Sequence, residues 1–106
     1  MQITAGKVAD GVTLGVGTVY SEPVNVTGCP RITFTGTSTA AAKVDIQMSQ
    51  AGYDETAPWV TLQTVDISSS APLNVTIETQ CNHARLALHD GSGAVVRAWI
   101  HGQQHR

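Results

Sequence analysis

Apolar and polar residues alternate with a period of two in short runs along this chain, and turn residues separate the runs. A period of two places successive side chains on opposite faces of a strand, whereas a surface helix needs apolar residues three or four positions apart. In the clearest run, 42–49, Val44, Ile46 and Met48 share one face. The same pattern predicts strands at 30–36 and 73–79, and weaker ones at 12–20, 23–27 and 59–67.

Clusters of glycine, proline and serine lie between these runs at the spacing typical of two-sheet domains. No run predicts the helix that a parallel crossover needs. We therefore expect an all-β fold, a mostly antiparallel β-sandwich or jelly roll of about eight strands. A chain of 106 residues fits a single domain, 1–106, in which the weakly patterned residues 1–11 are expected to form an N-terminal arm.

The last two strands are expected to form a hairpin. Its two apolar faces are Ala84, Leu86 and Leu88, then Val96, Ala98 and Ile100. Opposed residues in an antiparallel pair share a face, so the loop must have an odd number of residues, either 90–92 or 90–94. The shorter loop sets Arg85 against Arg97. The longer loop is favoured because it sets Arg85 against Trp99, where the guanidinium can lie on the indole.

Charge limits the classes of partner. Charged residues make up 13% of the chain and the formal net charge is -2, without a basic stretch. Nucleic-acid binding needs several cations to neutralise phosphates, so we expect no nucleic-acid partner. No segment approaches the roughly 18 apolar residues of a membrane span, and the N-terminus lacks the pattern of a signal peptide. We expect no membrane partner, and synthesis in a cytoplasm.

Histidines and cysteines are the residues that most often carry chemistry. In the favoured register His83 faces His101, which is short of the three or four ligands of a zinc site. Cys29 lacks the pattern of a catalytic Cys–His pair, and Cys29 and Cys81 are expected to be buried free thiols. We therefore expect no metal, no cofactor, no catalytic residue and no enzyme activity.

Aromatic residues are only 5% of the chain, so their positions matter. Trp99 alternates away from its apolar neighbours, and Trp59 opens a strand, where it either caps the core or lies on the surface. Tryptophan, tyrosine and arginine are enriched at interface hot spots. The candidates for an interface or a ligand site are Tyr53, Trp59, Arg85 and Trp99.

The segment 44–62 combines a strand, an Ala51-Gly52 loop and a strand opened by Trp59. With the later strands and the Gly-Ser-Gly turn, it resembles small virion proteins of tailed bacteriophages over residues 30–102. The resemblance implies a structural virion protein, a capsid decoration or head-stabilising protein assembled in the host cytoplasm. It also implies self-association, with a trimer favoured, and binding to the major capsid protein or another virion protein.

A carbohydrate- or receptor-binding β-sandwich is the alternative. In that case Tyr53, Trp59 or Trp99 would stack on sugar rings. A virion protein should sediment with particles, whereas a carbohydrate-binding module should be retained on a glycan column.

Overall fold

The computed structural model describes residues 3–49, 58–79 and 81–103, with side chains from residue 9 onward. Its strands, in chain order, are β1 (Ile3–Thr13), β2 (Val19–Tyr20), β3 (Val24–Asn25), β4 (Arg31–Ser38), β5 (Ala42–Ser49), β6 (Val60–Ile67), β7 (Leu73–Glu78), β8 (His83–His89) and β9 (Val95–Gln103). These described residues contain no helix, so the expected all-β class is confirmed. Accordingly, no helix in them is long and apolar enough to cross a membrane.

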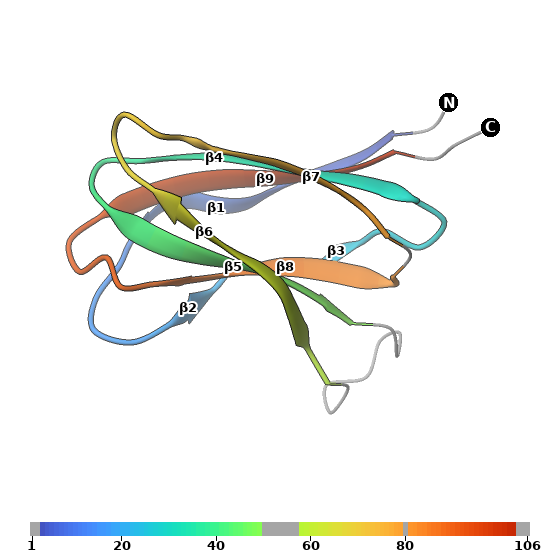
Figure 1. Ribbon diagram of the computed structural model, residues 1–106, viewed down its shortest axis with the longest axis horizontal. Helices are drawn as coiled ribbons and strands as arrows, with labels where there is room; N and C mark the ends of the chain where they lie inside the picture. Colours follow the sequence, from blue (N-terminus) through green and yellow to red (C-terminus); the bar gives the residue numbers. More distant parts are fainter. Residues whose placement is uncertain (1–2, 50–57, 80, 104–106) are drawn as a thin grey trace.

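Two antiparallel sheets face each other (Figure 1). The four-stranded sheet has the order β1-β9-β4-β7, and the five-stranded sheet has the order β2-β8-β5-β6, with β3 also paired to β8. The pairs are nested along the chain: β1 pairs with β9, β2 and β3 with β8, β4 with β7, and β5 with β6. Nested pairs distributed over two sheets are the topology of a jelly roll.

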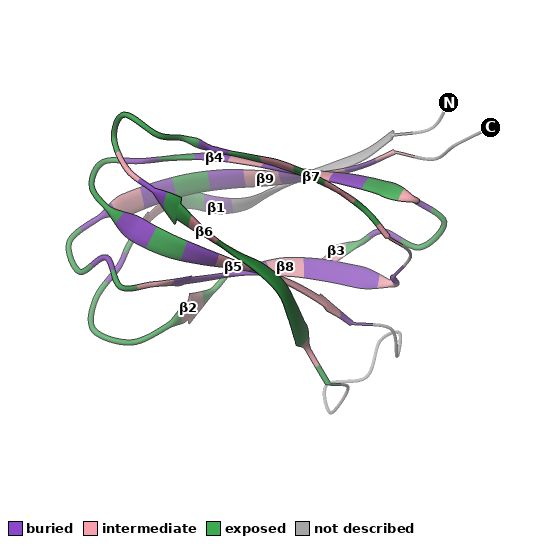
Figure 2. Cartoon of the chain, in the orientation of Figure 1, coloured by how far each residue is buried: buried purple, intermediate pink, exposed green. Residues whose placement is uncertain are grey.

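The core lies between the sheets because the strands alternate as their sequences predict. Figure 2 shows the resulting bands of buried and exposed residues along β4, β5 and β9. Ile32 and Phe34 of β4 and Val44 and Ile46 of β5 are at most 1% exposed. The expected inward faces of these strands are therefore confirmed.

The expected hairpin between the last two strands is wrong. β8 pairs with β5, whereas β9 pairs with β1 and β4 in the opposite sheet. The two apolar faces meet across the core rather than side by side within one sheet. The number of residues in the loop therefore does not decide which residues of β8 and β9 lie opposite each other. The loop crosses between sheets with a turn in which Ala94 N donates to Gly91 O at 2.8 Å.

The expected N-terminal arm is also corrected. Residues 3–11 form most of β1, which pairs with β9 from Ile3 opposite Gln103 to Thr13 opposite Val95. Two register shifts along this pairing explain why the alternation is weak there. The expected strand 12–20 is interrupted after Thr13 by a loop that leads to β2.

Candidate binding surface

The outer face of the five-stranded sheet carries an arginine between two aromatic rings, which we call the Arg85 clamp (Tyr20, Arg85 and Trp59). The Cζ atom of Arg85 lies 4.1 Å from the centroid of the Tyr20 ring and 4.1 Å from that of Trp59. Tyr20 comes from β2 at one edge of the sheet, and Trp59 directly precedes β6 at the other. The clamp therefore spans the width of the sheet.

Local register explains why the clamp forms on this face. Arg85 alternates with Ala84 and Leu86, which are fully buried in the core. Tyr20 lies opposite Ala87, whose side chain is only 1% exposed although it belongs to the outer face. We infer that this small, covered residue leaves room for the large side chains of the clamp.

A relay of polar side chains fixes the guanidinium. Arg85 Nε donates to Gln47 Oε1 at 2.8 Å, and Gln47 Nε2 donates to Thr61 Oγ1 at 3.2 Å. The three residues are cross-strand neighbours on β8, β5 and β6. Burial lowers the pKa of Arg85, with Tyr20 opposing the shift. The cation is thus partly desolvated and held in one orientation.

A second row of polar residues lies beside the clamp. His89 Nε2 lies 3.0 Å from Asp45 Oδ1, which also accepts a hydrogen bond from Thr64 Oγ1 at 2.8 Å. Next to it, Lys43 Nζ lies 3.8 Å from Asp66 Oδ1. The charges of this row are therefore paired within the domain.

Three of the four residues predicted for the site are in the described part, and the structure brings two of them together. Trp59 lies outside the core cluster, stacked on Arg85, so of its two alternatives the surface position is observed. Trp99 is half-buried on the outer face of the four-stranded sheet, opposite Thr35, so the expected Arg85–Trp99 contact is wrong. Tyr53 lies outside the described residues.

The clamp also contains Tyr20, which was not among the residues predicted from the sequence. Its outward position beside inward Val19 is a signal in the sequence, similar to that of Trp99. Its proximity to Arg85 depends on the pairing of β2 with β8, which are far apart in the chain. The expected facing of His83 and His101 is wrong for the same kind of reason, since His83 pairs with Ser49 and His101 with Thr33 in the other sheet.

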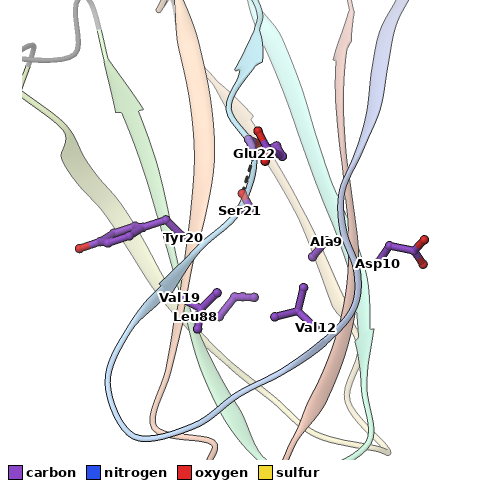
Figure 3. A pocket seen from close by; sticks show the side chains of 8 residues that line it. All are labelled: Ala9, Asp10, Val12, Val19, Tyr20, Ser21, Glu22 and Leu88. Carbon is purple, nitrogen blue, oxygen red and sulfur yellow. Dashed lines mark hydrogen bonds between the residues drawn. The ribbon is translucent and has the colours of Figure 1, made fainter.

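The two flanks of the sandwich, where the edges of the two sheets lie, differ in shape. On the β6 flank, Val60 and Leu62 are 52% and 40% exposed, and Figure 2 shows most of β6 as exposed. On the opposite flank, a groove of about 300 Å³ opens between β1 and β2. Figure 3 shows Val12, Val19 and Leu88 lining this groove, with the Tyr20 ring turned away from it.

The groove shows no nucleophile paired with a base among the residues that line it. The hydroxyl of Ser21 accepts from Leu86 N at 2.8 Å and donates to Glu22 O at 3.4 Å, so backbone groups occupy it. Over the described ranges, no group of three or more histidine, cysteine, aspartate and glutamate residues could hold a metal ion.

Comparisons with known proteins give information about the fold alone. No protein-family model matches the chain, and no curated protein matches its sequence. A solved chain of Bacillus endospore appendages, which form a novel family of disulfide-linked pili, is similar with a TM-score of 0.55. The sequence identity is 12%, over 97% of this chain and 89% of that chain. At this identity, the similarity shows that the two chains share a fold.

Proposed function

We propose that this domain is a non-enzymatic assembly subunit that binds copies of itself on a repeating protein surface. In the setting that the sequence resemblance favours, this surface is the capsid of a tailed bacteriophage, and the domain is a decoration or head-stabilising protein. The observation that carries the proposal is the exposure of Val60 and Leu62, at 52% and 40%, on the edge strand β6. Edge strands with exposed apolar residues invite pairing with another chain.

The two flanks suit a head-to-tail contact between copies. Val60 and Leu62 are exposed on one flank, and the opposite flank offers the groove whose lining includes Val12 and Val19. Such a heterologous contact forms a closed ring when the rotation between copies closes, and a trimer is the ring that we favour. Many weak contacts repeated over a lattice then give strong attachment without strong individual sites.

The pili to which the fold is similar favour assembly over catalysis for this chain as well. Their disulfide linkage does not transfer directly to this chain. Cys29 and Cys81 are free and only 2% and 5% exposed, so neither thiol is accessible to another copy without opening of the domain.

The proposal predicts that a charged β6 flank abolishes self-association. The double variant Val60→Lys/Leu62→Lys places two ammonium groups where the groove of the next copy would have to desolvate them. We expect light scattering to show an oligomer for the wild type and a monomer for this variant, with the β-rich circular dichroism spectrum unchanged. Cosedimentation with purified phage particles, lost in the same variant, would support the virion setting.

The matched control is Thr37→Lys/Ser92→Lys, which adds the same charge to exposed positions on the central strand β4 and in the loop between β8 and β9, away from the edge strands of both flanks. It should associate as the wild type does. A wild-type protein that stays monomeric both alone and with capsids would refute the proposal.

A carbohydrate-binding role is the second candidate, favoured by Tyr20, a residue that is 55% exposed on the outer face. It predicts retention on a glycan column that Tyr20→Ala abolishes. The assembly role predicts no such retention.

A further inference from the structure

Among the described side chains, ion pairing leaves one cation and one anion without an oppositely charged partner. Arg31 lies 3.0 Å from Glu78, Arg97 lies 3.6 Å from Asp10, and Lys43 is paired with Asp66. Of the lysine and arginine side chains that the structure describes, Arg85 alone has no carboxylate within salt-bridge distance.

The carboxylates give the converse result. Asp45 and Asp90 both lie near His89, at 3.0 and 3.5 Å. Glu22 is exposed at the rim of the groove and, among the described carboxylates, is the one without a basic partner.

The orientation of Arg85 leaves its outer edge available. The rings of Tyr20 and Trp59 stack on the guanidinium, and Nε is bonded to Gln47. Within the described part of the chain, the Nη1 and Nη2 groups make no hydrogen bond. These two groups form the planar fork that binds a carboxylate through parallel hydrogen bonds.

The positions of the two charges match the contact proposed above. Arg85 lies on the outer face of the five-stranded sheet, two strands in from the β6 edge, and contacts Trp59, which directly precedes the exposed Val60. Glu22 lines the groove on the opposite flank. A copy that inserts its β6 flank into the groove of the next copy therefore brings an unpaired cation towards an unpaired anion.

We propose that Arg85 of one copy binds the Glu22 carboxylate of the next copy, and that this ion pair sets the register of the head-to-tail contact. The inference rests on the proposed self-association and adds its charged contact. Since the guanidinium is already oriented and partly desolvated, little ordering is needed when the pair forms.

Charge reversal tests the pair. Arg85→Glu and Glu22→Arg should each weaken self-association at least tenfold in sedimentation equilibrium, because each places like charges opposite one another. The double variant Arg85→Glu/Glu22→Arg should regain association to within a fewfold of the wild type. High salt should weaken wild-type association, since it screens the pair.

Two further variants control for a folding defect and for a general effect of charge reversal. Glu22→Gln changes an exposed side chain and should weaken association without altering the melting temperature, so a folding defect at Arg85 cannot explain the result. Arg31→Glu is the matched control, because Arg31 is already paired with Glu78 and neither residue lines the groove, and its association should stay within about twofold of the wild type.

The outcomes separate this inference from the proposed function. If Val60→Lys/Leu62→Lys dissociates the oligomer while both charge reversals associate normally, the flank contact stands and the Arg85–Glu22 pair is wrong. A double reversal that fails to regain association also overturns the pair. A monomeric wild type overturns the proposed function, and the inference with it.

Discussion

At the scale of single residues, the His89–Asp45 pair is an interaction that depends on pH. The hydrogen bond with Asp45 raises the pKa of His89, with burial opposing and the carboxylate of Asp90 adding to the rise. Burial alone would raise the pKa of Asp45, but hydrogen bonds from His89 and Thr64 and the charges of His89 and Lys43 outweigh it, so the pKa is lowered.

These shifts predict a window of maximum stability. A raised folded-state pKa means that His89 stabilises the fold fully below its unfolded value of about 6.5, and loses this contribution as the pH rises through the folded value. Asp45 contributes above its unfolded value of about 3.9 and loses this contribution as the pH falls through its lowered folded pKa. Stability should therefore be lower at pH 8 than at pH 6, by less than about 1 kcal/mol for a partly exposed pair.

Urea melts at the two pH values measure this fall, and His89→Gln is the comparison. We expect the variant to lose the part of the pH dependence that belongs to His89. If the free energy of unfolding falls equally in the wild type and the variant, groups other than His89 cause the pH dependence.

The residues of the candidate site show what alternation can predict. It identifies Arg85 and Trp99 as outward-facing and Ile32 and Phe34 as inward-facing, because each position depends only on local parity. It does not identify partners on a face. Arg85 does stack on a tryptophan, but on Trp59, since the pairing that decides this joins strands far apart in the chain.

At the scale of strands and loops, the crossing from β8 to β9 depends on Gly91. A Cβ atom there would lie 2.5 Å from Ala42 Cβ and 2.9 Å from Ala41 O, where it meets backbone that cannot easily move. We expect Gly91→Ala to lower the free energy of unfolding by about 1–3 kcal/mol, the usual cost of overpacking. A denaturant melt measures the change.

Gly15 provides the matched control in another loop. A Cβ atom at Gly15 has no atom within 4 Å, so Gly15→Ala should change stability by less than about 1 kcal/mol, in either direction. Equal effects of the two substitutions would show that the loop after β8 is not packed against Ala42.

The strands themselves were predictable where both of their faces are patterned. The expected run 42–49 is β5 residue for residue, and 30–36 and 73–79 differ from β4 and β7 by no more than two residues at either end. The hairpin between β8 and β9 was not predictable, because inward faces look alike whether their strands share a sheet or oppose each other across the core. Only the tertiary fold decides between the two.

At the scale of the whole molecule, the nested topology makes stability cooperative. β9 contacts strands from the start and middle of the chain, and β8 contacts β2, β3 and β5. No half of the sequence can close its own part of the core. The fold should therefore open globally rather than in separate pieces. Folding should be slow, because the strand pairs join residues that are far apart in the chain.

Cys29 and Cys81 report this global opening. Both thiols are free and buried, and burial raises the pKa of Cys81, with the nearby Cys29 adding to the rise. A buried, protonated thiol reacts only after the chain opens. In the native state we expect alkylation to be at least about a hundredfold slower than in denaturant, where both thiols should react. Mass spectrometry after pulses of alkylating reagent counts the labels.

Gly91→Ala should speed native labelling about tenfold for each ~1.4 kcal/mol of stability that it removes. Fast native labelling that does not change in this variant would mean that the cysteines open locally, and the absence of free thiols in denaturant would mean that they form a disulfide.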